Sequence, residues 1–373
     1  MYLDHAATTP MHPDVWEAMR PFATDVWGNP SGTHATARRA KNAVEEARER
    51  AAAILGAHAD EIVFTSGGTE SDNLALKGVA LAEGGPHDVV TTSIEHEAVL
   101  DPAEWLERMG VKVRYAEPDE QGVVPADDVL SLVDGSTGLV SIMAANNETG
   151  VSQPVADVAR VIRATWPGTA VHTDAVQAFT TERLDVDALG VDLLTLSAHK
   201  FGGPKGVGLL YVRRGTPLAP VNHGGGQELG RRSGTLNPMG IVGMVTAMGI
   251  TEADRGRHRR RVMAERDAFE ARLTHLVPGA VVTGRDVARV AGHSHVRIPG
   301  VDQQIALIKL DRIGISASGG SACSSGAVTA SHVLLAMGLD AVEARTALRF
   351  TFGSTTTPGD GVTAAEGVAE AIG

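Results

Sequence analysis

Lys200 follows a predicted strand and lies in a glycine-rich loop. The loop covers residues 197–206, with the sequence SAHKFGGPKG, and comes directly after the apolar run at residues 193–196. In α/β proteins such loops present ligands at the carboxyl ends of the strands, and a lysine shielded from water there can act as a nucleophile. Most lysines are solvated surface residues, so the interpretation depends on what the other strand ends provide.

A glycine-rich turn follows an earlier predicted strand. Residues 66–71 read SGGTES and stand between the apolar run at residues 62–65 and a helical pattern. Free backbone N–H groups, a hydroxyl group and a helix N-terminus are features that bind a phosphate group. The same turn also fits a simple reversal of the chain, and taken alone it does not decide between the two.

Two further strand ends carry polar side chains. Asp174 ends the predicted strand at residues 170–173, and Asn146 and Asn147 follow the strand at residues 139–143. A buried carboxylate needs a cation or hydrogen-bond donors, which a protonated pyridine nitrogen supplies; the alternative is a helix N-cap. A phosphate cradle, a carboxylate and a lysine together indicate pyridoxal phosphate, whose ring nitrogen pairs with an aspartate.

The elements that must position these side chains alternate between strand and helix. Helical periodicity predicts helices at residues 38–55, 69–81 and 155–164. Seven strands are predicted, at residues 62–65, 89–92, 111–115, 139–143, 170–173, 193–196 and 207–212. Strands separated by helical crossovers form a mostly parallel sheet with both faces covered. The sequence therefore predicts an α/β fold, with a large domain at residues 14–253.

The pattern changes after Pro238, where a long helical stretch begins. Four further strands are predicted at residues 281–283, 296–298, 315–318 and 348–351, with helices between them. We therefore expect a smaller α+β domain formed by residues 1–13 and 254–373. The basic run at residues 254–266 has no interleaved aromatic residues, which favours a solvated helix face over a nucleic-acid patch.

Composition and charge exclude several classes of function. The chain has 373 residues, enough for two domains, and 33 basic against 45 acidic residues give a net charge of -12. This charge opposes binding to nucleic acid or to an anionic membrane. The sequence shows neither a secretory signal nor an uncharged apolar stretch of about 18 residues, and its single cysteine, Cys323, forms no internal disulfide. We expect a cytoplasmic protein without a metal site.

An ordered series of motifs covers nearly the whole chain. They are YLDHAATTP at residues 2–10, GNPS at 28–31, TSGGTES at 65–71, Glu95-His96, NNE at 146–148, DAVQ at 174–177, His199-Lys200, RSGT at 232–235 and GSAC at 320–323. The series resembles the cysteine desulfurases of the NifS and IscS type. These belong to the class V aminotransferase-like, fold-type I pyridoxal phosphate enzymes, which have a large domain with a seven-stranded sheet and act as homodimers.

The resemblance implies a role for each matching residue. Lys200 corresponds to the lysine that carries the cofactor, Asp174 to the partner of the pyridine nitrogen, and His96 to the catalytic residue that stacks on the ring. The remaining cofactor contacts are implied for Gly68, Thr69, Ser197 and His199 at the phosphate, for Thr235 from the other subunit, and for Gln177 and Asn147 at the ring substituents. Arg349 would hold the substrate carboxylate, with Asn29 and Asn147 as further substrate contacts; the alternative for Arg349 is a structural ion pair.

The implied reaction uses both the lysine and the thiol. Cys323 would attack the sulfur of L-cysteine, keep it as a persulfide and leave L-alanine; the sulfur would pass to an acceptor protein for iron-sulfur cluster assembly or thiolation. A lone cysteine is usually buried and inert, but the small polar neighbours of Cys323 favour an exposed, mobile loop. The chain departs from the family at Gly32, where serine is common, and at Ser354, where many members have arginine.

Three other functions remain open at this point. A selenocysteine lyase or a C–S β-lyase would use the same cofactor, and in a simple elimination Cys323 would be dispensable. A homologue without activity would serve as a binding subunit, but the presence of Lys200, Asp174, His96 and Cys323 together argues against it.

Overall fold

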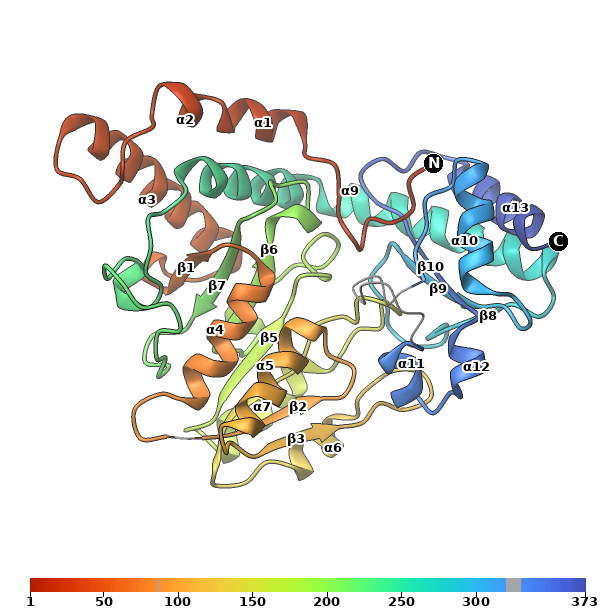
Figure 1. Cartoon of the computed structure of the whole chain (residues 1–373), viewed down its shortest axis with the longest axis horizontal. Helices are drawn as coiled ribbons and strands as arrows, with labels where there is room; N and C mark the ends of the chain where they lie inside the picture. The colour runs from red at the N-terminus through yellow and green to blue at the C-terminus, as the bar shows by residue number, and fades with distance from the viewer. Residues whose placement is uncertain (86, 320–329) are drawn as a thin grey trace.

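Two β-sheets are connected by one long helix. The computed structural model describes residues 1–85, 87–319 and 330–373. The helix, α9 (Pro238–Leu276), runs along the larger sheet with its first half and reaches the smaller sheet with its second (Figure 1). Asn237 caps it by accepting a hydrogen bond from the Gly240 N–H, and Pro238 occupies its first turn.

The larger sheet has seven strands and is mostly parallel, as predicted. Its strands are β1 (Ile62–Thr65), β2 (Asp88–Thr92), β3 (Val113–Ala116), β4 (Thr137–Ser141), β5 (Ala170–Asp174), β6 (Leu193–Ser197) and β7 (Gly208–Val212). They lie in the order β1-β7-β6-β5-β4-β2-β3, and β7 is antiparallel to both of its neighbours. Each strand lies within two residues of its predicted bounds.

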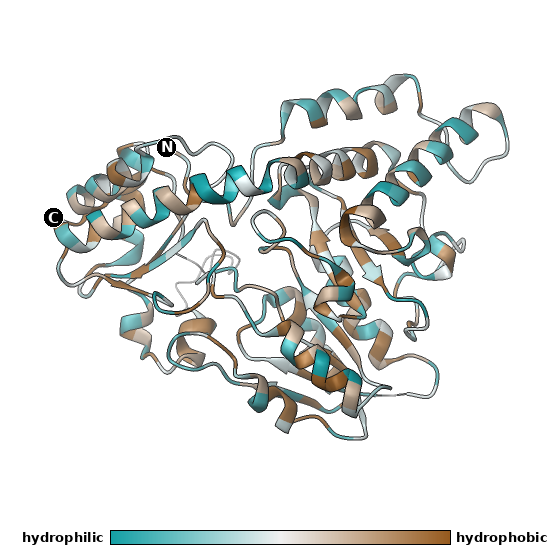
Figure 2. Cartoon of the chain, turned by 180° about the vertical axis from the view of Figure 1, so that it is seen from behind, coloured by the Kyte–Doolittle hydropathy of each residue, from teal (hydrophilic) through white to brown (hydrophobic). Residues whose placement is uncertain are grey.

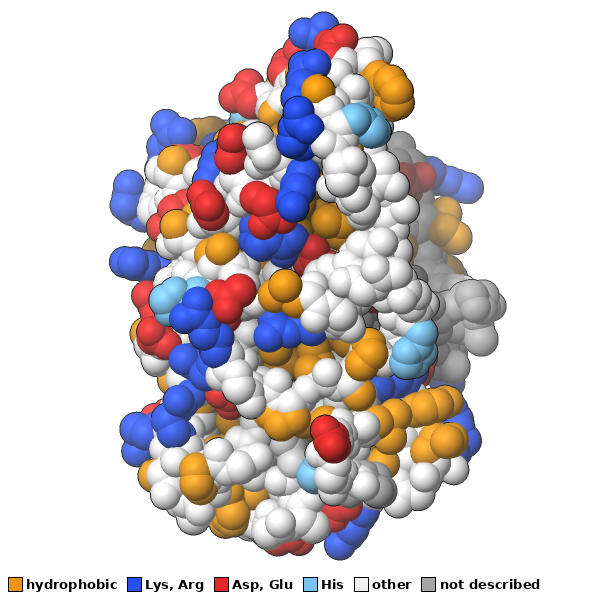
Figure 3. Space-filling model, turned by 90° about the vertical axis from the view of Figure 1, so that its left-hand side faces the viewer, with side chains coloured by type: hydrophobic (Ala, Val, Ile, Leu, Met, Phe, Trp, Pro, Cys, Tyr) orange, Lys and Arg blue, Asp and Glu red, His pale blue; other side chains and the backbone are white. Residues whose placement is uncertain are grey.

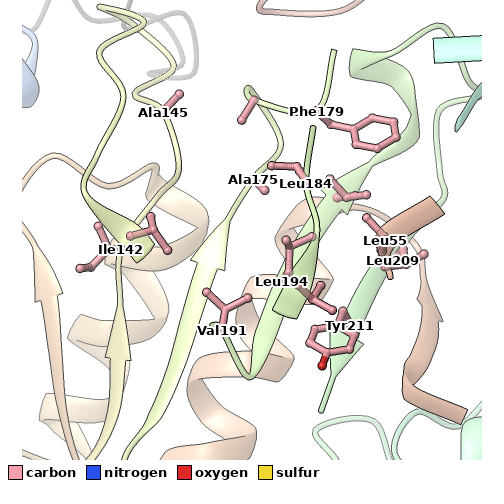
Figure 4. Packing of buried hydrophobic residues seen from close by; sticks show 14 of the residues in the cluster. Leu55, Ile142, Ala145, Ala175, Phe179, Leu184, Val191, Leu194, Leu209 and Tyr211 are labelled. Atoms are coloured by element: carbon pink, nitrogen blue, oxygen red, sulfur yellow. The ribbon is translucent and has the colours of Figure 1, made fainter. Parts of the chain in front are cut away.

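Both faces of this sheet are buried, which explains the continuous apolar runs. Val90, Val140, Val171 and Leu194 point to one face, and their chain neighbours point to the other. The first face packs against α3 (Ala35–Leu55), α7 (Val155–Thr165) and the beginning of α9; part of this core is seen in Figure 4. The second face packs against α4 (Gly68–Ala80) and α5 (Glu97–Arg108).

Short helices complete the layer around the larger sheet. They are α1 (Pro13–Met19), α2 (Pro21–Thr24), α6 (Ala126–Ser131) and α8 (Val186–Leu189), with single 3-10 turns at Ala59–Glu61, Ala198–Lys200 and Glu228–Gly230. On the face seen in Figure 3, basic and acidic side chains are interspersed.

The smaller sheet is antiparallel, with the order β10-β9-β8. It contains β8 (Val281–Val282), β9 (His293–Arg297) and β10 (Ala347–Thr351), and its helices are α10 (Gln303–Arg312), α11 (His332–Ala336), α12 (Ala341–Ala344) and α13 (Asp360–Ile372). The prediction of a strand at residues 315–318 is wrong. Ser316 and Ser318 form only single bridges, to Tyr2 and Arg349, because the N-terminal segment enters here and Asp4 pairs with Thr351.

The middle of α9 is hydrophilic, in contrast to its beginning (Figure 2). The basic run lies in this part of the helix, where Arg255 pairs with Glu252, Arg257 with Asp254 and Arg259 with Glu182. The domain boundary that we predicted between residues 253 and 254 falls within the same helix and stays a prediction. No helix of the described residues has the length and hydropathy needed to cross a bilayer.

Candidate active site

A cavity of about 570 Å³ opens where β1, β4, β5 and β6 end. Nine of the residues that we predicted for the cofactor line it: Gly68, Thr69, His96, Asn147, Asp174, Gln177, Ser197, His199 and Lys200. They come from five separate segments of the chain. The fold therefore brings together side chains that the sequence places up to 132 residues apart, from Gly68 to Lys200.

Lys200 ends the 3-10 turn that follows β6. Its Nζ donates to the carbonyl oxygens of Ala6 at 2.5 Å and Ala7 at 3.0 Å. The hydroxyl of Thr9 donates to the His199 carbonyl at 2.8 Å, which fixes the N-terminal segment against the turn. Ala7 and Thr8 thus form a wall of the cavity next to the lysine.

The turn that we predicted as the phosphate cradle lies between β1 and α4. Gly67 precedes the first turn of α4. The N–H groups of this first turn have no partners within the helix. Strand β7 passes so close that a Cβ atom on Gly208 would lie 2.6 Å from the backbone carbon of Gly67. Glycine at position 208 therefore allows the turn to sit against the sheet.

Asp174 lies at the end of β5 and is buried. Its Oδ1 accepts a hydrogen bond from the Val176 N–H at 2.9 Å. Burial raises the pKa of this carboxyl, while His96 and Lys200 act in the opposite direction. A cation placed in the cavity, such as a pyridinium, would stabilise the ionised form.

A second buried acid, Asp72, was missed by the sequence analysis. It belongs to α4, lines the cavity, and has its Oδ1 3.6 Å from His172 Nε2. Burial raises the pKa of Asp72 and lowers that of His172 to about 3. The imidazole of His172 also lies 3.1 Å from the Thr195 hydroxyl and 2.9 Å from that of Ser141. The sequence signal that could have identified Asp72 was an acidic residue shortly after the predicted cradle. Whether its side chain points into the cavity depends on how α4 packs on the sheet.

His96 is the N-cap of α5, where its Nδ1 accepts a hydrogen bond from the Ala98 N–H at 3.0 Å. The proton of the neutral imidazole therefore lies on Nε2. Burial lowers the pKa of His96, so the neutral form predominates at pH 7. The adjacent Glu95 is fully buried, which raises its pKa to about 8.

Amide side chains complete the lining. Gln177 donates to the Ala6 carbonyl at 3.1 Å. The buried Oδ1 of Asn147 has no hydrogen-bond partner among the described residues. An unpaired buried acceptor indicates a ligand group that is to be bound there. The lysine, the cradle, the carboxylate and this amide fit pyridoxal phosphate.

Three predicted residues that the structure describes do not line the cavity. Arg349 is buried beside it, donating from Nη1 to the Asn147 carbonyl at 2.9 Å and from Nη2 to Asp4 at 2.8 Å. Asn29 is exposed and accepts from the Ser31 N–H. Thr235 is exposed as well. Cys323 lies outside the described residues. The roles of all four stay predictions.

Described residues on both sides of positions 320–329 form hydrogen bonds with distant parts of the chain. Gln303 donates to the Gly319 carbonyl at 2.9 Å. The Ser331 hydroxyl donates to Glu148 at 2.6 Å, and His332 Nε2 lies 2.9 Å from the carbonyl oxygen of Glu95. Since Glu95 precedes His96, the chain re-enters the described structure next to a residue that lines the site.

Comparisons with known proteins identify the family to which the chain belongs. The family model "Aminotransferase class-V" matches residues 1–360. A protein of Dictyoglomus turgidum named cysteine desulfurase IscS is 42% identical over 362 residues, which cover 96% of this chain and 91% of the relative. A solved structure titled "NIFS-LIKE PROTEIN" superimposes with a TM-score of 0.92 at 38% identity, covering 99% of this chain and 98% of the other. A structure titled "SspA in complex with cysteine" gives a TM-score of 0.83 at 36% identity, covering 95% and 99%.

Proposed function

Because this chain belongs to the class V aminotransferase family, as a pyridoxal phosphate-dependent cysteine desulfurase, we propose that it converts L-cysteine to L-alanine and holds the released sulfur on Cys323. One observation carries the assignment of the site: Lys200, Asp174, His96 and the turn before α4 line a single cavity. Cysteine as the substrate is supported by the SspA structure, which contains cysteine.

Each part of the cofactor has a complementary group in the cavity. The first N–H groups of α4, the Thr69 hydroxyl and the side chains of Ser197 and His199 would bind the phosphate. Asp174 would pair with the ring nitrogen, and Asn147 and Gln177 would contact the ring substituents. When bound, pyridoxal phosphate withdraws electrons from the α-carbon of the amino acid and thereby activates its C–S bond.

The chain's own residues would move the protons. The Lys200 amine would take the α-proton of cysteine, because it lies within the same cavity as the cofactor contacts. His96 would stack on the ring and donate from Nε2, the nitrogen that does not accept from Ala98. Arg349 is fixed at the edge of the site by Asp4 and by the Asn147 carbonyl, where it would bind the substrate carboxylate together with Asn29 and Asn147.

Sulfur transfer requires one thiol. The Cys323 thiolate would attack the substrate sulfur as the C–S bond breaks, so that the protein gains an S–S bond and the carbon skeleton leaves as alanine. As the chain has a single cysteine, the persulfide would pass to a thiol of an acceptor protein. Iron-sulfur cluster assembly and thiolation of a cofactor or nucleic acid are the pathways to which such an acceptor would belong, in the cytoplasm.

A second copy of the chain would complete the cradle. Thr235 is exposed, although its segment is held at the cradle: Arg232 forms an ion pair with Glu70 at 2.7 Å, and Glu70 accepts from the Ser66 N–H at 2.6 Å. In a homodimer, Thr235 would reach the phosphate of the partner's site. The large domain, residues 14–253, would hold both halves of this interface.

The test is to quantify alanine and sulfide formed from L-cysteine in the presence of a reducing thiol. We expect equal amounts from the wild type, and loss of both in Cys323→Ala, while the absorption band of the bound cofactor is kept. Lys200→Ala should lose that band as well.

Other outcomes would contradict the proposal. Pyruvate in place of alanine, or full activity in Cys323→Ala, would indicate a C–S β-lyase. A strong preference for selenocysteine would indicate a selenocysteine lyase. Absence of a cofactor band after purification with pyridoxal phosphate would indicate a binding subunit.

A further inference from the structure

A second cavity, of about 480 Å³, lies on the other side of the N-terminal segment. Ala6 lines this cavity and Ala7 lines the active site, while Lys200 and Gln177 belong to both linings. The remaining walls come from the middle of α9, from the segment after β10 and from residues before β9. The cavity is therefore adjacent to the active site but has walls of its own.

One end of this cavity contains nitrogen atoms without partners. His5 is 6% exposed and His293 is 7% exposed, and both line the cavity. His5 Nδ1, His293 Nε2 and Arg261 Nε have no hydrogen-bond partner among the described residues. Buried polar atoms are nearly always paired in folded proteins, so three unpaired nitrogen atoms on residues that line one cavity are unusual.

The same end carries an uncompensated positive charge. Arg261 forms no ion pair within the described residues; its Nη2 lies 3.3 Å from His258 Nδ1 and 3.5 Å from the carbonyl oxygens of Gly353 and Ser354. Asp254, the carboxylate in the lining, is already paired with Arg257. This is the hydrophilic part of α9 seen in Figure 2. Ser354 has a short side chain, which leaves room beside Arg261.

The opposite end is apolar. Phe201, Ala247, Ile250 and Met11 face it, from the Lys200 loop, from α9 and from the N-terminal segment. A cavity with apolar walls and a few convergent polar groups is the usual form of a small-molecule site, and its volume is within the common range of about 300–1,000 Å³. One unpaired arginine and two neutral imidazoles suit a single negative charge better than a doubly charged phosphate.

We propose that this cavity is a second ligand site, which binds a small organic carboxylate with its acid group on Arg261, His5 and His293 and its apolar part against Phe201, Ala247 and Ile250. The guanidinium supplies charge-assisted hydrogen bonds to the carboxylate, and the imidazole nitrogens donate from the sides. The proposal is independent of the desulfurase reaction. Lys200 and Gln177 line both cavities, so the bound acid would lie in a cavity that shares two residues with the active site.

The test is calorimetric titration of the cofactor-loaded enzyme with benzoate and with its neutral counterpart benzamide. We expect benzoate to bind and benzamide to bind at least about tenfold more weakly, since a hydrogen bond to a charged group contributes roughly 1.5–3 kcal/mol. Arg261→Met should weaken benzoate to a similar extent, and Arg261→Lys should restore most of the affinity. Arg260→Met, an exposed neighbour on α9 outside the cavity, is the matched control and should bind like the wild type.

Benzoate at the substrate site is distinguished by Arg349→Met. Binding that survives Arg349→Met and is lost in Arg261→Met supports the second site. Binding lost in Arg349→Met and kept in Arg261→Met, equal affinity for benzamide, or no heat at millimolar benzoate would overturn it. Should Arg261→Met fail to fold, the comparison of benzoate and benzamide in Arg349→Met decides, and a crystal of that variant with 4-iodobenzoate locates the iodine.

Discussion

Glu95 is a fully buried carboxyl group next to His96, a residue that lines the active-site cavity. Its Oε1 accepts from the Met143 N–H at 2.8 Å and from the Thr92 hydroxyl at 2.9 Å, whereas Oε2 has no hydrogen-bond partner within the described residues. Burial raises its pKa to about 8. At pH 7 the group is therefore mostly protonated in the folded protein and ionised in the unfolded chain.

This difference predicts a pH-dependent effect of Glu95→Gln. Between pH 4.5 and 8 the folded state binds one more proton at Glu95 than the unfolded state, so this group lowers stability as pH rises. Glutamine keeps the acceptor and removes the titration. The free energy of unfolding of the variant should therefore rise relative to the wild type by up to about 1.4 kcal/mol per pH unit from pH 5.5 to 7.5.

Urea unfolding at three pH values measures this difference. Glu97→Gln is the matched control variant, because Glu97 is exposed on the same turn. A Glu95→Gln difference that is constant between pH 5.5 and 7.5 would show that Glu95 is ionised in the folded protein.

At the scale of elements, strand–turn–helix units were predicted well because their signals are local. The strand, the glycine turn and the helix around Gly68 all lie within about 20 residues, and β1 has the predicted bounds. The pairing of Ser316 with Tyr2 joins distant parts of the chain, and no local periodicity reports it. Asp72 was missed for the same reason, since it meets His172 only because α4 packs on β5.

The unit formed by the cradle and β7 gives a prediction for Gly208→Ala. The added methyl group would lie 2.6–2.7 Å from the Gly67 backbone, so the turn must shift. We expect the affinity for pyridoxal phosphate to fall by about tenfold or more, because the shift would displace the N–H groups at the start of α4, which we propose as donors to the phosphate. Fluorescence titration of the apoenzyme with pyridoxal phosphate measures this affinity.

Gly168→Ala is the matched control for the cradle. A Cβ atom at position 168 has no atom within 4 Å, and the residue lies before β5 at the opposite end of that strand from Asp174. Unchanged cofactor affinity in Gly208→Ala would mean that the turn tolerates the displacement and that its geometry does not set binding.

At the scale of the whole molecule, buried histidines occur in both sheets. Their effect on the pH dependence of stability is opposite to that of the buried acid Glu95. Burial lowers the pKa of His172 in the larger sheet and of His293 and His295 in the smaller one to about 3. Below pH 6.5 the unfolded chain binds protons that these imidazoles do not, so each histidine lowers stability as pH falls. Glu95 acts in the opposite direction, and the two classes partly compensate between pH 4.5 and 6.5.

Removing one histidine should expose this compensation. His295 is fully buried in β9, with Nδ1 2.9 Å from the Thr283 hydroxyl, a contact that asparagine can keep. His295→Asn leaves a smaller side chain and should lower stability at pH 7.5, but the deficit should shrink by up to about 1.4 kcal/mol per pH unit below pH 6.5. His275→Asn, at an exposed position on α9, is the matched control variant. Urea midpoints at pH 7.5, 6.5 and 5.5 provide the comparison, and a deficit that stays constant or grows toward pH 5.5 would mean that His295 is protonated in the folded protein.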